Sequence, residues 1–110
     1  MRVVVTVDRP IGYNHKGSIY TVNYGYVSGV IGGDGHWQDA YILDSSISRP
    51  VESYSGSLIA VVVRDDDNET KWIVSNENLS ADEIYKQIEF IERFFKSRVH
   101  LIENYPADKL

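Results

Sequence analysis

The hydrophobic and polar positions of the first 75 residues follow the short patterns that are typical of β-strands. The segments that we expect to form strands are 2–7, 19–27, 38–43, 58–63 and 71–74. Gly25 interrupts the second segment and suggests a bulge or a close backbone approach. The continuous apolar run of the fourth segment indicates a strand buried on both faces, which pairs with the fifth as a hairpin. Short strands at this spacing predict a small barrel or sandwich.

The pattern changes at residue 80, where apolar residues begin to recur at helical spacing. Ser80 and Glu83 have the spacing of a capping box, in which each side chain accepts a hydrogen bond from the backbone of the other residue. The expected buried stripe consists of Ile84, Ile88, Ile91 and Phe95. We therefore expect a helix over 80–97. A mixed tail follows, with a short strand or an extended segment near Val99 and a frayed end over 106–110.

Length and composition are those of a globular protein, and they predict one domain over residues 1–110. No apolar run approaches the roughly 18 residues that a membrane helix needs. The first residues do not resemble a signal peptide, because charged Asp8 and Arg9 follow a short apolar stretch. The absence of cysteine excludes disulfides, thiolate chemistry and cysteine-bound zinc. We therefore expect a cytoplasmic protein with no membrane partner.

The chain is acidic, with 11 Lys and Arg against 16 Asp and Glu and a net charge of −5. A protein that binds duplex nucleic acid needs a basic face against the phosphates. The charge therefore argues against a nucleic-acid partner, and it suits a protein that binds cations.

A glycine-rich turn over 32–39 contains the densest group of polar residues. Asp34 and Asp39 flank this turn, and His36 lies between them. Carboxylate oxygens are natural ligands of Mg²⁺, and a histidine can act as a general base or a metal ligand. Local chemistry alone favours a plainer interpretation, in which Asp34 makes an Asx-type hydrogen bond in a polar turn and His36 is a surface histidine.

A second acidic group lies in the loop 65–70, directly before Lys71. Taken alone, such a loop is a solvated hairpin tip. Its functional interpretation is a second source of carboxylates for a shared metal ion, with Lys71 available to bind an anion. The tyrosines at 20, 24 and 26 either donate to phosphate oxygens or pack as ordinary strand aromatics.

These segments together resemble one known family. The stretch 20–26, Tyr-Thr-Val-Asn-Tyr-Gly-Tyr, is similar to the pattern Tyr-Pro-x-Asn-Tyr-Gly-Tyr, and 34–39 is similar to Asp-Gly-Asp-x-x-Asp at the same distance. Residues 69–71, Glu-Thr-Lys, look like an Asp-x-Lys motif, and 87–96 resembles a C-terminal helix that ends in Tyr-Lys. The family with these motifs is that of the soluble, Mg²⁺-dependent inorganic pyrophosphatases.

The resemblance implies an α+β, mainly β fold: a small OB-like five-stranded barrel with a C-terminal helix packed on it. It implies hydrolysis of inorganic pyrophosphate, or a related phosphoanhydride, with Mg²⁺ as cofactor and Mn²⁺ as the alternative. A homo-oligomer is also expected. The implied metal ligands are Asp34, Asp39, Glu69 and either Asp65 or Asp66. The implied phosphate-binding residues are Tyr24, Lys71 and Lys96, with Tyr20 in the wall of the site. The residues proposed for catalysis are His36, Asp34 and Asp39.

The sequence also departs from the family pattern. His36 replaces the aspartate associated with activating the nucleophilic water, Thr6 replaces an active-site glutamate, and Phe95 replaces a tyrosine. The family also has a segment with further charged residues. In this sequence that segment is reduced to 12–17, where His15 and Lys16 are the expected substitutes for those charged residues. We therefore expect weak activity or a shifted substrate. The alternative is an impaired module that binds metal, a phosphate-bearing ligand or a partner; binding of single-stranded nucleic acid is the weakest hypothesis.

Overall fold

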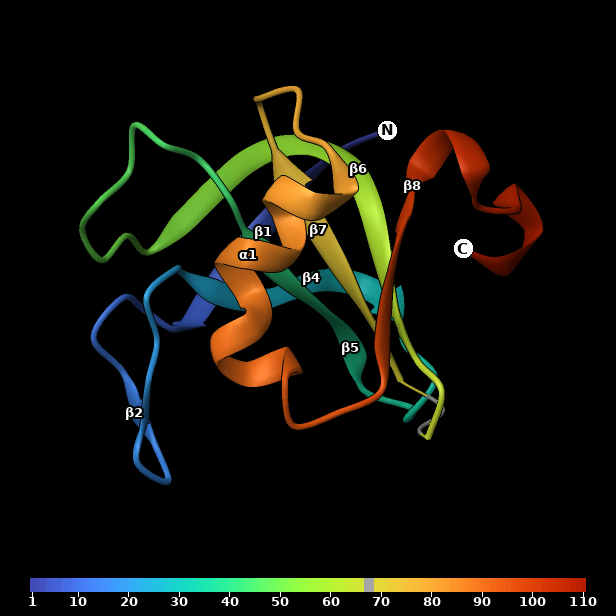
Figure 1. Cartoon of the computed structure of the whole chain (residues 1–110). Coiled ribbons are helices and arrows are strands. Elements are labelled where there is room, and N and C mark those ends of the chain that lie inside the picture. Colours follow the sequence, from blue (N-terminus) through green and yellow to red (C-terminus); the bar gives the residue numbers. More distant parts are fainter. Residues whose placement is uncertain (67–68) are drawn as a thin grey trace.

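The computed structural model describes residues 1–66 and 69–110. A closed barrel forms the body of the protein (Figure 1). Its strands are β1 (Arg2–Arg9), β4 (Tyr24–Ile31), β5 (Trp37–Ile42), β6 (Ser53–Arg64) and β7 (Thr70–Ser75). They are paired in the order β1-β4-β5-β7-β6, and β6 returns to β1 to close the barrel. The β5–β7 pair is parallel, whereas the other pairs of the barrel are antiparallel. The predicted small, mainly β, OB-like barrel is confirmed.

Alternate residues of the strands point to opposite faces and build two cores. The barrel interior contains side chains from all of its strands, among them Val5, Val27, Ala40, Val61 and Trp72. The second core lies between the outside of the sheet and the helix, and it includes Tyr41, Val62, Ile73, Ile84 and Ile88. The apolar run of β6 is therefore buried on both faces, as its sequence predicts.

The helix α1 (Ala81–Glu92) packs across one side of the barrel (Figure 1). Ser80 caps it, and the reciprocal hydrogen bonds with Glu83 form the predicted capping box. Ile84 and Ile88 are fully buried. The helix ends at Glu92, five residues before the predicted end at 97. The chain turns there because β8 (Ser97–Leu101) must begin at residue 97 to pair with the edge of β6.

Phe95 is consequently not part of the buried helical stripe. Its side chain lies beyond the helix end and is 37% exposed. The Arg64 guanidinium lies 3.7 Å from the centre of its ring. The expectation of a buried Phe95 was wrong because the helical periodicity stops one turn before it.

The segment 19–27 differs from a continuous strand, because β4 begins only at Tyr24. A small hairpin, β2 (Asn14–His15) and β3 (Ser18–Ile19), precedes it. Asn23 lies between this hairpin and β4, outside either strand. Its buried side chain accepts a hydrogen bond from the Ile11 backbone N–H and donates one to the Arg49 carbonyl. These hydrogen bonds connect Asn23 to two distant loop segments, directly before β4 begins.

The remaining differences concern loops and the C-terminus. A Cβ atom at Gly25 would collide with the Thr6 backbone, so the predicted close approach is confirmed. The tail forms two short 3₁₀ helices, η1 (Ile102–Asn104) and η2 (Ala107–Lys109), and the second lies in the segment 106–110, where a frayed end was expected. Asp67 and Asn68 of the acidic loop lie outside the described residues. No helix in the described part of the chain is long and apolar enough to cross a membrane.

Candidate functional site

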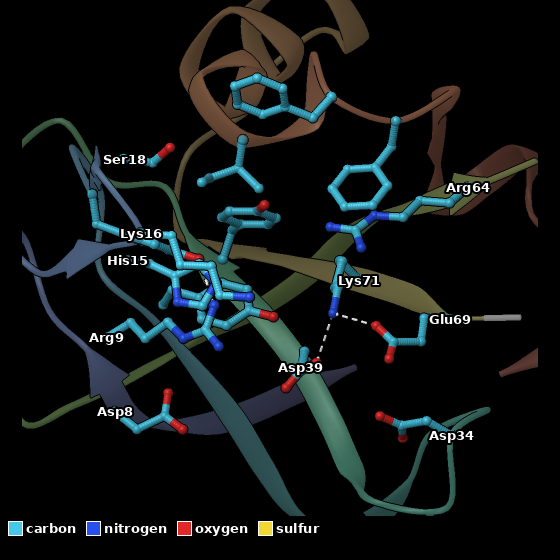
Figure 2. A pocket seen from close by; sticks show the side chains of 16 residues that line it. Asp8, Arg9, His15, Lys16, Ser18, Asp34, Asp39, Arg64, Glu69 and Lys71 are labelled. Atoms are coloured by element: carbon cyan, nitrogen blue, oxygen red, sulfur yellow. Dashed lines mark hydrogen bonds and ion pairs between the residues drawn. The ribbon is translucent and has the colours of Figure 1, made fainter. Parts of the chain in front are cut away.

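A cavity of about 570 Å³ opens where the end of β1, the β2–β3 hairpin, β4, β5 and the end of α1 meet. Acidic and basic side chains line it together. The acidic residues are Asp8, Asp34, Asp39 and Glu69, and the basic residues are Arg9, His15, Lys16, Arg64 and Lys71. Figure 2 shows Arg9, His15 and Lys16 grouped on one side of this cavity, whereas Lys71 points toward Asp39 and Glu69.

The three carboxylates of Asp34, Asp39 and Glu69 form the centre of the site. One oxygen of each lies within 4.8 Å of one oxygen of each other member. The parallel pairing of β5 with β7 explains this, because Ala40 is opposite Trp72 and the residues just before them therefore meet. The fold thus brings Glu69 close to Asp34 and Asp39, which precede it by 35 and 30 positions, and these are three of the residues expected as metal ligands.

Asp34 reaches this cluster from the turn before β5. Its Oδ1 accepts a hydrogen bond of 2.9 Å from the His36 backbone N–H, which is the expected Asx-type contact. This hydrogen bond lowers the pKa of Asp34, so its side chain is ionised at neutral pH. The turn hydrogen bond and membership of the carboxylate cluster therefore coexist at Asp34.

Lys71 is buried beside the cluster. Its Nζ donates hydrogen bonds of 2.7 Å to Asp39 Oδ2 and to Glu69 Oε2, and it lies 5.8 Å from the centre of the Tyr24 ring. Burial alone would lower the pKa of Lys71, but Tyr24 and the two carboxylates outweigh burial and raise this pKa. The ammonium group therefore stays charged and bridges the two carboxylates.

These residues fit a divalent cation such as Mg²⁺. Lys71 offsets only part of the negative charge of the Asp34, Asp39 and Glu69 carboxylates. Asp39 uses its Oδ2 for the hydrogen bond with Lys71, and its Oδ1 takes no part in that hydrogen bond. Hard cations prefer such oxygen ligands, and Mg²⁺ usually binds one or two carboxylates together with water and phosphate.

Arg9 is a cavity residue that the sequence reasoning missed. Its guanidinium lies 5.5–5.9 Å from the centres of the Tyr13, Tyr20 and Tyr24 rings, and its Nη1 donates a 2.8 Å hydrogen bond to Tyr20 Oη. A guanidinium group has five N–H donors, so others are available to an anion. Nothing in the local sequence around Arg9 distinguishes it, because the ring cluster forms only in the folded chain.

Asp8 was also missed, and a β-bulge explains why it faces the cavity. Val7 is opposite Gly25 and Arg9 is opposite Tyr24, so Asp8 is an extra residue in β1. A bulge of this kind redirects side chains, often beside functional sites. Position 6 lacks the carboxylate expected from the resemblance, but β1 contributes Asp8 to the cavity two residues later.

The tip of the β2–β3 hairpin adds Lys16 and His15 to the cavity, as the sequence analysis expected for the reduced segment. Lys16 has a φ of 53° and Gly17 a φ of 91°, which together make the tight hairpin turn. The positive charge of Arg9 is the main factor that lowers the pKa of His15, and a neutral imidazole is therefore favoured near pH 7.

A buried ion pair between Arg64 and Glu92 lies beside the cavity, which Arg64 and Phe95 both line. Arg64 donates from Nε to Glu92 Oε1 at 3.0 Å and from Nη2 to Glu92 Oε2 at 2.7 Å. Tyr41 and Ser97 each donate a further hydrogen bond of 2.6 Å to the same carboxylate. The network ties the end of α1 to β5, β6 and β8, and it fixes the position of Arg64.

Four predicted residues do not line the cavity that contains the carboxylate cluster. His36 is not among the residues that line the 570 Å³ cavity; it lines a neighbouring one. Asp65 pairs with Arg98 at 2.7 Å, and Asp66 is exposed outside the cavity. Lys96 is also exposed outside the cavity, because the early helix end places it at the entry to β8, where its carbonyl accepts from the Asp65 N–H.

The fold is similar to several solved inorganic pyrophosphatases. The enzyme from Ehrlichia chaffeensis aligns with a TM-score of 0.64 and 14% identity, over 94% of this chain and 86% of that one. The Helicobacter pylori enzyme gives 0.63 and 16% over 91% and 81%, and the Coxiella burnetii protein gives 0.61 and 14% over 92% and 83%. No family model and no curated protein matches the sequence. The chain therefore has the fold of the inorganic pyrophosphatases.

Proposed function

We propose that this protein hydrolyses inorganic pyrophosphate, or a related phosphoanhydride, to phosphate with the help of a divalent cation. The observation that carries the proposal is the composition of the 570 Å³ cavity, where a carboxylate cluster for a cation faces several positively charged side chains. Such a combination suits a ligand that has phosphate oxygens and a bound cation at the same time. The similarity of the fold to inorganic pyrophosphatases supports this choice of substrate.

Asp34, Asp39 and Glu69 would bind the cation, with Mg²⁺ as the first choice and Mn²⁺ as the alternative. A divalent cation at such a site neutralises charge on phosphate oxygens and lowers the pKa of a water molecule. Lys71 holds the Asp39 and Glu69 carboxylates in position through its two hydrogen bonds. The same ammonium group is also close enough to the cavity to meet a phosphate oxygen.

Phosphate binding is assigned to the positively charged side of the cavity. Arg9 is oriented by its hydrogen bond to Tyr20 and by the surrounding rings, so a planar fork of N–H donors is prepared before the substrate arrives. Lys16 would add a mobile point charge from the hairpin tip. Donors of this kind stabilise the negative charge that develops on phosphate oxygens during the reaction.

The base that accepts a proton from the attacking water is proposed to be Asp8. The sequence assigned this role to His36, but His36 lines the neighbouring cavity. Asp8 lines the cavity of the cluster and is not one of the three clustered carboxylates. A general base needs to be within reach of the proton, and geometry decides before pKa does.

Phosphate release from pyrophosphate tests the proposal. We expect release with Mg²⁺ or Mn²⁺, and a fall of about 100-fold or more in kcat/KM for Asp39→Asn, because this change removes a carboxylate shared by the cluster and Lys71. Asp108→Asn is the matched control, since Asp108 is exposed in η2 and outside the cavity. Equal activity of both variants would contradict the assignment of the site.

A second candidate function is binding without turnover. His36, the general base expected from the sequence, does not line the cavity of the carboxylate cluster, and this favours binding without turnover. In this case Mg²⁺ or pyrophosphate should raise the melting temperature, because a ligand that binds only the folded state stabilises it, while no phosphate is released.

A further inference from the structure

A second cavity of about 400 Å³ borders the first one. Asp8 and Asp39 line both cavities, so the two spaces meet at these side chains. The other walls come from β4, from the turn before β5 and from the first residue of β5. A ligand that occupies the carboxylate cluster can therefore extend past Asp39 into this second space.

An exposed aromatic pair forms a wall of the second cavity. The Trp37 and Tyr26 ring centres are 5.5 Å apart with 30° between the ring planes, and Trp37 remains 47% exposed. Ile31, opposite Trp37 in the strand register, is 63% exposed. Large apolar side chains at this exposure leave a flat surface on which another ring can stack.

Trp37 directly follows the turn that positions Asp34. The Gly32 N–H donates to the His36 carbonyl at 2.7 Å, and the His36 N–H donates to Asp34 Oδ1 at 2.9 Å. These hydrogen bonds close the turn directly before Trp37. The turn therefore places the backbone of Trp37 between Asp34 and Asp39, two members of the carboxylate cluster.

The charges of the two cavities are different. Among the described residues that line the second cavity there is no lysine or arginine, whereas Asp8 and Asp39 contribute carboxylates. A phosphate group would be repelled in this space, and a neutral ring would not. The first cavity contains Arg9, Lys16, Arg64 and Lys71. The two spaces therefore suit the two halves of one molecule, an anionic chain of phosphates and an uncharged aromatic ring.

We propose that the substrate is a nucleoside di- or triphosphate whose base stacks on Trp37 while its phosphates lie among the lysine and arginine side chains of the first cavity. This inference rests on the proposed hydrolytic function and names its substrate class. With a triphosphate, the oxygen of water bonds to the terminal phosphorus and the bridging P–O bond breaks. The products are a nucleoside diphosphate, phosphate and one proton, which Asp8 accepts.

Tryptophan fluorescence measures the stacking directly. The chain has two tryptophans, and Trp72 is 3% exposed in the barrel interior, so a ligand that stacks on Trp37 changes the emission of the exposed one. The probes are the β,γ-imido analogues of ATP, GTP, CTP and UTP, each with Mg²⁺, and imidodiphosphate is the control without a ring. We expect at least one nucleotide analogue to quench the emission with saturation, and imidodiphosphate to leave it unchanged.

Kinetics of variants test the same contact. The measured quantity is kcat/KM for the nucleotide divided by kcat/KM for pyrophosphate. In Trp37→Ala this ratio should fall about tenfold, which corresponds to about 1.4 kcal/mol. That loss lies within the range for the stacking of one base on an aromatic side chain. Trp37→Tyr retains a ring and should recover most of this ratio. A circular dichroism spectrum confirms that each variant is folded.

The outcomes separate this inference from the proposed function. If none of the four analogues quenches the emission while pyrophosphate is hydrolysed, the ring site is refuted and the hydrolytic function stands. If an analogue quenches the emission but no phosphoanhydride is hydrolysed, the ring site stands and the hydrolytic function fails. A dimer that Trp37→Ala converts to a monomer, without quenching in the wild type, would show that this surface binds a second copy and would overturn the inference.

Discussion

Replacing Glu92 by alanine should destabilise the fold by about 3–5 kcal/mol. The carboxylate accepts hydrogen bonds from Arg64, Tyr41 and Ser97, and its side chain is fully buried. Removing it leaves the Arg64 guanidinium, on a residue that is 7% exposed, without its counter-charge. An uncompensated buried charge costs more than the ion pair contributes, because no water replaces the lost partner.

Thermal unfolding followed by circular dichroism measures this effect. At about 4 °C per kcal/mol for a chain of this length, the melting temperature should fall by about 12–20 °C. The control is the double variant Arg64→Met, Glu92→Leu, which removes both charges and should recover at least about half of the loss. A melting temperature of Glu92→Ala within about 3 °C of the wild type would refute the role of this network.

The same contacts give the stability a pH dependence. Burial alone would raise the pKa of Glu92, but the hydrogen bonds from Arg64, Ser97 and Tyr41 outweigh burial and hold this pKa below its ordinary value. Because the pKa is lower in the folded state, the stabilisation is present above the unfolded pKa of about 4.3 and is lost as the pH falls through the folded value. Urea unfolding between about pH 6 and pH 3 should therefore show a steeper loss of stability in the wild type than in Glu92→Gln.

Further variants test other parts of the account. Ser80→Ala removes the cap of α1 and should lower stability by about 1 kcal/mol, seen as a fall of about 4 °C in melting temperature. Gly25→Ala should abolish folding, because the added Cβ would collide with the β1 backbone. In Gly32→Ala, the nearest atoms to the added Cβ lie 3.4 Å away, so this variant should yield folded protein. Lys71→Met removes the ammonium group between two half-buried carboxylates and should cost about 1–3 kcal/mol; Mg²⁺ should then raise the melting temperature more in this variant than in the wild type.

Local patterns were sufficient for the capping box and for most of the barrel strands, although β4 begins later than expected. Alternating and continuous apolar runs depend on neighbours within a few positions, and they are visible without the fold. The cluster of Asp34, Asp39 and Glu69 was expected because the resemblance placed these residues together, and the parallel pairing of β5 with β7 provides the contact.

The features that sequence reasoning missed depend on distant pairing. Asp8 enters the cavity only because β1 bulges where it pairs with β4, and no local signal marks that bulge. The early end of α1 likewise depends on Glu92 meeting Arg64, a residue 28 positions away. Lys96 and Phe95 were misplaced for the same reason, since helical periodicity alone does not show where the next strand must begin.

The central claim is that the clustered carboxylates and the basic side chains that face them hydrolyse phosphoanhydrides, inorganic pyrophosphate among them. The most direct measurement is the amount of phosphate formed from inorganic pyrophosphate by the wild-type protein across a series of Mg²⁺ and Mn²⁺ concentrations. The account predicts two phosphates for each pyrophosphate consumed, with no release when a chelator removes the cation. Folded protein that releases no phosphate at any concentration of either metal would contradict it.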